Sequence, residues 1–87
     1  MFVIVVYDIA EKRVAKVLKK SRQYLYWVQN SVFEGEISEA KYKKYVTELK
    51  KIINLEEDSV IIYNLRTSKY SSREVIGLEK GGQSNIL

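Results

Sequence analysis

Two short segments of this chain are apolar at both odd and even positions. They are residues 2–7 (FVIVVY) and 59–65 (SVIIYNL), and both are rich in β-branched and aromatic side chains, which favour β-strands. Successive side chains of a strand point to opposite faces of its sheet, so strands of this kind are expected to be buried on both faces. Any fold for this sequence must therefore cover both sides of a sheet.

Helical spacing replaces this pattern in two other segments. Apolar residues recur at helical intervals from Glu11 to about Ser21, and again from Tyr42 to Ile53, which predicts two helices with one buried face each. Ser38 is expected to cap the second helix, because its hydroxyl can accept a hydrogen bond from a backbone N–H of the first turn.

Strand character returns between the two helices. Residues 24–37 are largely apolar and aromatic around the polar pair Asn30-Ser31. This pair predicts a tight hairpin turn, and a single kinked strand is the alternative. The C-terminal part is expected to contain a polar loop, a short last strand and a flexible tail, at residues 66–72, 74–78 and 81–87.

The order of these elements predicts the fold. In a chain of 87 residues, strand-helix-strand-strand-helix-strand plus one extra strand favours an α+β, ferredoxin-like βαββαβ sandwich with both helices on one sheet face. A single domain at residues 1–80 follows. The other face would expose an apolar patch too large for a monomer. The sequence therefore predicts a homodimer packed sheet face to sheet face, with the strand at 74–78 along the partner's edge.

Composition narrows the chemistry, because the chain contains no His, Cys or Pro. Catalytic triads, thiolate nucleophiles, the usual zinc sites and disulfides are excluded. Catalysis would have to use carboxylates, hydroxyls, Lys, Arg or a hard metal ion bound through oxygen. The apolar segment 2–7 has no basic residue before it and is too short to cross a bilayer. A cytoplasmic protein without membrane contact is expected.

Asp8, which directly follows the first strand, is the sharpest candidate for a functional residue. An aspartate between a strand and a helix commonly caps the helix, which is the simpler role. The functional alternative is a ligand for Mg²⁺, which needs only one or two protein carboxylates. A two-fold dimer would supply one Asp8 from each chain.

The first predicted helix carries an unusual excess of positive charge. Residues 11–23 contain six cations and one anion, so the i,i+4 pairs that normally balance such a helix are nearly absent. A solvated outer face explains most charge runs, but this one also suits a phosphate backbone. The cations are Lys12, Arg13, Lys16, Lys19, Lys20 and Arg22. Aromatic residues nearby could stack on bases, although core packing is the simpler role.

Several of these segments together resemble the small CRISPR-associated proteins of spacer acquisition, the non-integrase Cas2 family. The resemblance covers nearly the whole chain. The segments that carry it are Tyr7-Asp8-Ile9, Arg13-Val14, residues 29–36 (QNSVFEGE), residues 58–63 (DSVIIY) and Ile76-Gly77.

The resemblance implies a ferredoxin-like homodimer with a swapped terminal strand. In the adaptation complex this dimer would bridge two integrase dimers and brace double-stranded DNA for insertion as a spacer. The resemblance also implies a metal-dependent nuclease acting on single-stranded RNA or double-stranded DNA, with Mg²⁺ bound by Asp8 at the dimer axis. Tyr7, Arg13 and Phe33 would join Asp8 in the catalytic site.

Two positions depart from the family pattern. Some nuclease-active relatives carry an arginine where this chain has Trp27, and a further one where it has Glu11. Of the two implied functions, bracing of DNA is favoured over hydrolysis of nucleic acid. Spacer acquisition needs the geometry of the dimer whether or not the protein cleaves nucleic acid. The alternative function is a protein-interaction module whose charge serves solubility.

Overall fold

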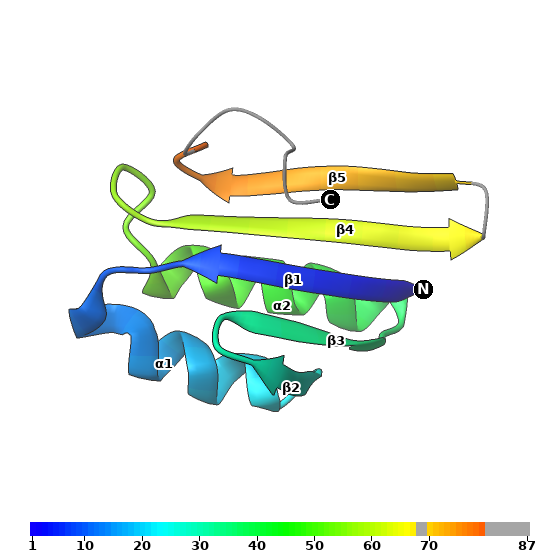
Figure 1. The fold of residues 1–87 in the computed structure, drawn as a ribbon, viewed down its shortest axis with the longest axis horizontal. Coiled ribbons are helices and arrows are strands. Elements are labelled where there is room, and N and C mark those ends of the chain that lie inside the picture. The colour runs from blue at the N-terminus through cyan, green and yellow to red at the C-terminus, as the bar shows by residue number, and fades with distance from the viewer. Residues whose placement is uncertain (68–69, 80–87) are drawn as a thin grey trace.

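The structure is a computed structural model that describes residues 1–67 and 70–79. These residues form two helices and five strands (Figure 1). In chain order the elements are β1 (Phe2–Asp8), α1 (Glu11–Arg22), β2 (Tyr26–Gln29), β3 (Val32–Glu36), α2 (Glu39–Ile52), β4 (Ser59–Thr67) and β5 (Tyr70–Gly77).

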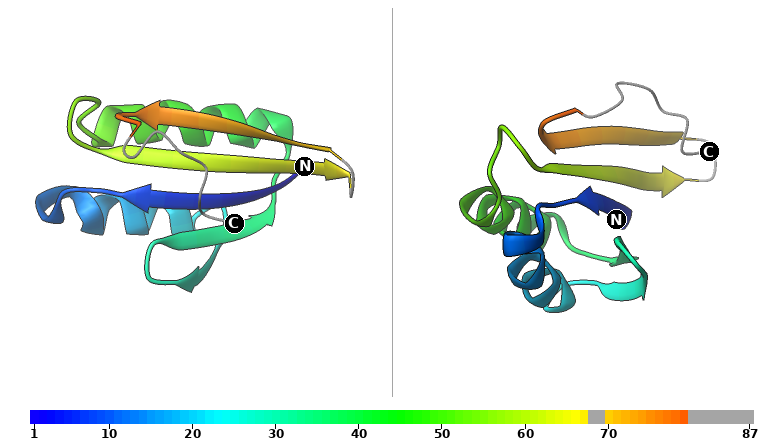
Figure 2. Two further views of the ribbon diagram at one scale, coloured as in Figure 1. Left: turned by 45° about the horizontal axis from the view of Figure 1, so that its top comes forward. Right: turned by 60° about the vertical axis from the view of Figure 1, so that its left-hand side comes forward.

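One antiparallel sheet contains all five strands, in the order β2-β3-β1-β4-β5. Figures 1 and 2 show both helices on the same face of this sheet. The predicted ferredoxin-like α+β fold with one additional strand is therefore confirmed. Neither helix in the described part of the chain is long and apolar enough to cross a membrane.

Strand β1 lies in the middle of the sheet and alternates strictly in burial. Val3, Val5 and Tyr7 are buried against the helices, whereas Phe2 and Ile4 on the other parity are half-buried. The helices contribute Val17, Tyr45, Val46 and Leu49 to the same core. Only the helix-covered face is thus fully buried within one chain, and the opposite face is called here the open face.

The predicted hairpin between the helices is confirmed, and the alternative of a single kinked strand is wrong. Strands β2 and β3 pair antiparallel across a turn at Asn30, which has a positive φ of 44°. Asn tolerates this left-handed conformation better than most residues. The predicted cap of α2 is also confirmed, since the Ser38 hydroxyl accepts a hydrogen bond from the Lys41 backbone N–H at 3.2 Å.

The C-terminal part differs from the sequence prediction in the extent of its strands. Residues 66–72 were expected to form a loop, but β4 continues to Thr67 and β5 begins at Tyr70. The reason is that backbone pairing holds polar residues such as Ser71 and Ser72 in a strand without an apolar pattern. Within its own chain, β5 pairs with β4, and its expected place along a partner's edge stays a prediction. The expected tail at 81–87 lies outside the described residues.

Gly77 closes β5 against the loop that precedes β4. Its φ is +90°, and a Cβ at this position would lie 2.3 Å from the carbonyl oxygen of Asp58. The same oxygen accepts a hydrogen bond from the Leu78 N–H at 2.8 Å. Only glycine allows this close approach, because a side chain would collide with backbone rather than with a movable group.

Replacement of Gly77 by Ala is expected to lower the free energy of unfolding by about 2 kcal/mol, from strain at a positive φ and from this collision. The melting temperature should fall by about 10 °C. Gly35→Ala is the matched control, because Gly35 also has a positive φ, of +157°, but its Cβ would contact nothing closer than 3.4 Å. Thermal unfolding of both variants measures the difference. Equal melting temperatures would show that the contact with Asp58 imposes no constraint.

Candidate functional site

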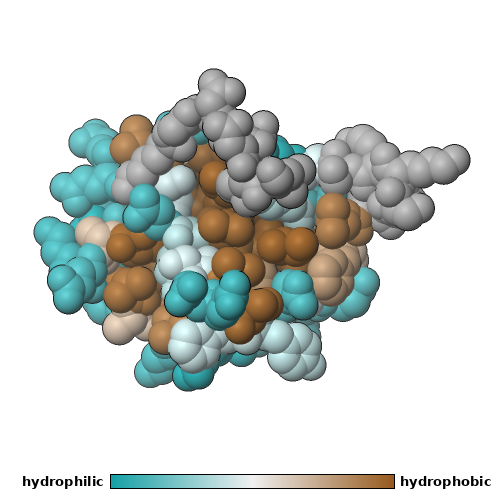
Figure 3. Space-filling view, viewed as in Figure 1, coloured by the Kyte–Doolittle hydropathy of each residue, from teal (hydrophilic) through white to brown (hydrophobic). Residues whose placement is uncertain are grey.

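Asp8 is the last residue of β1, and its side chain is exposed. It shares its parity with Phe2, Ile4 and Val6, so it points toward the open face. Ser59, the first residue of β4, lies directly opposite Asp8 in the register. Figure 3 shows apolar side chains gathered on this side of the sheet. Asp8 therefore stands at the end of an apolar stripe that the helices do not cover.

Tyr7 and Phe33 lie on the opposite side of the sheet from Asp8. Both are buried beneath the helices, and their rings stack with centroids 6.1 Å apart. Burial raises the pKa of the Tyr7 phenol above its ordinary value. The structure thus places both aromatic rings in the core and does not bring them together with Asp8. Neighbours on a strand point to opposite faces, which is why sequence adjacency to Asp8 is misleading.

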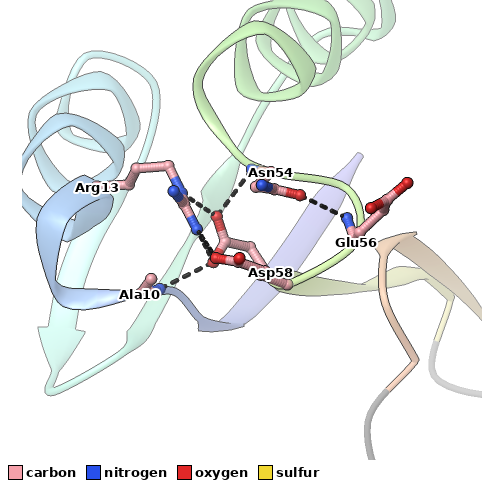
Figure 4. A network of polar contacts seen from close by, with 6 residues as sticks. Ala10, Arg13, Asn54, Glu56 and Asp58 are labelled. Carbon is pink, nitrogen blue, oxygen red and sulfur yellow. Dashed lines mark hydrogen bonds and ion pairs between the residues drawn. The ribbon is translucent and has the colours of Figure 1, made fainter.

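Arg13 contacts Asp58 (Figure 4) and also Glu57, and both of these residues precede β4. Its Nε donates to Asp58 Oδ2 at 2.5 Å, and its Nη2 donates to Asp58 Oδ1 at 3.1 Å. Nη2 also donates to Glu57 Oε1 at 2.8 Å. The guanidinium is therefore part of an ion pair within the fold, and its expected place beside Asp8 in a catalytic site has no support in these contacts.

Asp58 is completely buried and is the centre of this polar network. Besides the two bonds from Arg13, it accepts hydrogen bonds from the backbone N–H groups of Ala10 at 2.9 Å and Asn54 at 2.8 Å (Figure 4). The hydrogen bond from Arg13 holds the pKa of Asp58 well below its usual range. Burial opposes this shift, and the two backbone N–H groups add to it. The carboxylate is thus ionised and fully engaged.

We call this network of Ala10, Arg13, Asn54, Glu57 and Asp58 the latch. It joins the turn after β1 to the loop before β4, two segments 45 residues apart in the sequence. The hydrogen bonds from Ala10 and Arg13 to Asp58 therefore hold the turn that follows Asp8 against the loop before β4. This role of Asp58 was not predicted from the sequence. The available signal was its position directly before a strand that is apolar on both faces.

The exposed cations of α1 form a continuous positive surface. Lys12, Lys16, Lys19 and Arg22 are exposed, and Lys20 is half-buried with its Nζ 3.5 Å from Glu48. A hollow of about 320 Å³ opens on this surface, lined by Lys16, Lys19, Lys20, Gln23 and Ile52. The structure therefore brings together five of the six expected cations and assigns Arg13 to the latch instead.

The oxygen donors near Asp8 allow a test of the expected Mg²⁺ site. Residues 1–67 and 70–79 contain no group of three or more acidic side chains that could hold a metal ion. Asp58, the nearest acidic residue before β4, is engaged by the latch. Asp8 therefore lies in no such group within the described residues, and it fits Mg²⁺ only if a second copy supplies another carboxylate or solvent completes the shell.

Comparisons with known proteins converge on one family. A family model described as CRISPR associated protein Cas2 matches residues 1–73. A protein of Dictyoglomus turgidum is 54% identical over 87 residues, and one of Thermotoga maritima is 53% identical over 87 residues. In both cases the match covers 100% of each chain, and both relatives are named CRISPR-associated endoribonuclease Cas2.

Solved structures give the same result. A crystal structure of a Cas2 protein has a TM-score of 0.74 and 44% sequence identity, covering 93% of this chain and 91% of that one. Streptococcus pyogenes Cas2, crystallised at pH 6.5, has a TM-score of 0.59 and 29% identity, covering 93% of this chain and 89% of that one.

Proposed function

The chain belongs to the Cas2 family of CRISPR-associated proteins, and we propose that it acts as the homodimeric, non-integrase component of the spacer-acquisition complex. In this role it would bridge integrase dimers, brace nucleic acid on α1 and cleave phosphodiester bonds with Mg²⁺ held by Asp8. The observation that carries this proposal is the position of Asp8 on the open face. One contact between two copies would cover the apolar stripe and bring two aspartates together.

The open face supports dimerisation by its composition. Phe2, Ile4 and Val6 run along its central strand, with Val32 and Ile61 beside them on the neighbouring strands. Two sheets of this kind pack face to face about 10 Å apart. A two-fold axis makes identical patches meet, so each residue near the axis lies close to its own copy. With the axis near the end of β1, the Asp8 carboxylates of two chains would share one site.

Asp8 would hold the metal ion, and the latch would keep the turn after Asp8 in place. When bound, Mg²⁺ supplies positive charge that stabilises the phosphate as the bond breaks. The chain has no histidine, so carboxylates and solvent would have to carry any proton transfer. The name endoribonuclease borne by the two relatives supports RNA as a substrate class.

The positive surface of α1 supports nucleic-acid binding. Lys12, Lys16 and Lys19 follow one another at intervals of four and three residues, so they lie along one side of the helix. From Lys12 to Arg22 this side is about 15 Å long at 1.5 Å per residue. The hollow lined by Lys16 and Lys19 offers ammonium groups from two helical turns to one phosphate.

Replacing both Lys16 and Lys19 by Glu is expected to weaken binding of a DNA duplex at least tenfold at low salt. The slope of log affinity against log salt should fall by about 2, because two phosphate contacts are lost. Fluorescence anisotropy of a labelled duplex between about 50 and 200 mM salt measures both quantities. Lys41→Glu with Lys44→Glu on α2 is the charge-matched control. Equal weakening in the two double variants would exclude α1 as the binding surface.

A further inference from the structure

Strand β2 is an outer strand of the sheet, and all four of its residues are exposed. Tyr26 is 78% exposed and Trp27 is 47% exposed. A large aromatic side chain whose only role is core packing is usually buried. Their exposure here indicates a surface that meets something else.

Trp27 is held in place although half of it is exposed. Its Nε1 donates a hydrogen bond to the carbonyl oxygen of Asn30 at 2.9 Å. The guanidinium carbon of Arg22 lies 5.0 Å from the centre of the indole ring, within the range of a cation–π contact. Trp27 also pairs with Phe33 in the register, so it lies on the helix side of the sheet, whereas Tyr26 lies on the open side. The indole is thus a fixed aromatic surface at the end of α1.

The surroundings of this indole are positively charged. Arg22 is the last residue of α1, and Lys19 precedes it by about one turn. Figures 1 and 2 show β2 beside the C-terminal part of α1. A ring placed beside a row of cations suits nucleic acid better than an apolar protein surface, because the phosphates match the cations while a base matches the ring.

We propose, resting on the nucleic-acid binding proposed for α1, that Trp27 and Arg22 form a stacking site for an unpaired nucleobase. The ligand class is single-stranded RNA or DNA with its backbone on the cations of α1. Bases inside a blunt duplex are already stacked on each other and do not reach the ring. Stacking on an aromatic side chain accepts any base, so the site has little sequence preference.

Trp27 is the only tryptophan of the chain, which also has seven tyrosines, so fluorescence excited where tyrosine does not absorb reports on this site alone. The full chain is titrated with single strands of about 15 nucleotides, oligo-dT and oligo-U, and with a blunt duplex. Anisotropy of labelled strands is followed in parallel. We expect the single strands to quench the tryptophan with the midpoint seen by anisotropy, and the duplex to bind without quenching. Comparison of oligo-dT with oligo-U shows whether the sugar matters.

Trp27→Ala is expected to weaken single-strand binding about tenfold and duplex binding less than twofold, since stacking contributes about 1–3 kcal/mol per base. Trp27→Phe should keep most of the affinity. Tyr26→Ala, on the other side of the same strand, is the matched control and should bind as the unaltered protein does.

Two failures can be told apart in this experiment. If the unaltered chain binds neither single strands nor duplex, the nucleic-acid function proposed for α1 is wrong. If the duplex binds but single strands leave the fluorescence unchanged, or Trp27→Ala weakens both ligands equally, the stacking site is wrong and the function of α1 stands.

Discussion

Asp8→Asn protein is expected to lose Mg²⁺-dependent cleavage, with a rate at least about a hundredfold below that of the unaltered chain. An amide oxygen carries no charge, so the bound metal ion and the several kcal/mol of transition-state stabilisation that it supplies would be lost. Single-turnover cleavage of end-labelled single-stranded RNA and duplex DNA, with Mg²⁺ or with a chelator, measures the effect. The dimer should persist, because the apolar stripe is unchanged.

Glu56→Gln is the control for this experiment. Glu56 is exposed in the loop before β4, and its backbone N–H bonds to the Asn54 side chain. The same carboxylate-to-amide change should leave cleavage unaltered there. If Asp8→Asn protein still cleaves, and does so in the presence of a chelator, neither Asp8 nor a metal ion takes part in the cleavage.

Asp58→Asn is expected to lower the free energy of unfolding more than Glu57→Gln, the other carboxylate-to-amide change in the latch. The change leaves Arg13 without its buried counter-charge, which costs about 3 kcal/mol or more. For a chain of this size the melting temperature should fall by about 12 °C or more. Glu57→Gln is the control, because this second partner of Arg13 is 56% exposed and exposed ion pairs contribute less than about 1 kcal/mol. Equal losses in the two variants would contradict the central role of Asp58.

The same pair predicts a pH dependence of stability. The pKa of Asp58 is lower in the folded chain than in the unfolded chain. In the unfolded chain an aspartate has a pKa of about 3.9. The stabilisation is therefore fully present above that pH and is lost progressively as the pH falls below it. Urea unfolding at neutral pH and in acid should show this additional loss in the unaltered chain, while Asp58→Asn protein lacks it. A parallel acid loss in both proteins would assign the effect to other groups.

The architecture could be predicted because it follows from local patterns. The two-sided apolar strands required a central place in a sheet, and the helical periods of α1 and α2 required one buried face each. The turn at Asn30 and the cap at Ser38 are equally local. These features depend on residues close in the sequence, which is why they agree with the structure.

The site was less predictable because its contacts connect distant residues. Arg13 was expected beside Asp8, yet its partner Asp58 lies 45 positions away and no spacing rule reveals it. Tyr7 and Phe33 were grouped with Asp8 by the family resemblance, although strand parity directs them into the core. The extent of β5 was missed because its polar residues are held by backbone pairing with β4.

The central claim is that two Asp8 carboxylates form one metal site in a dimer. Its most direct test is the stoichiometry of Mn²⁺ binding, followed by electron paramagnetic resonance, with the mass of the assembly determined on the same sample by sedimentation. The expected result is a dimer that binds one ion per two chains and loses this ion when Asp8 is replaced by Asn. A monomer, one ion per chain, or binding that is unchanged in Asp8→Asn protein would contradict the shared site.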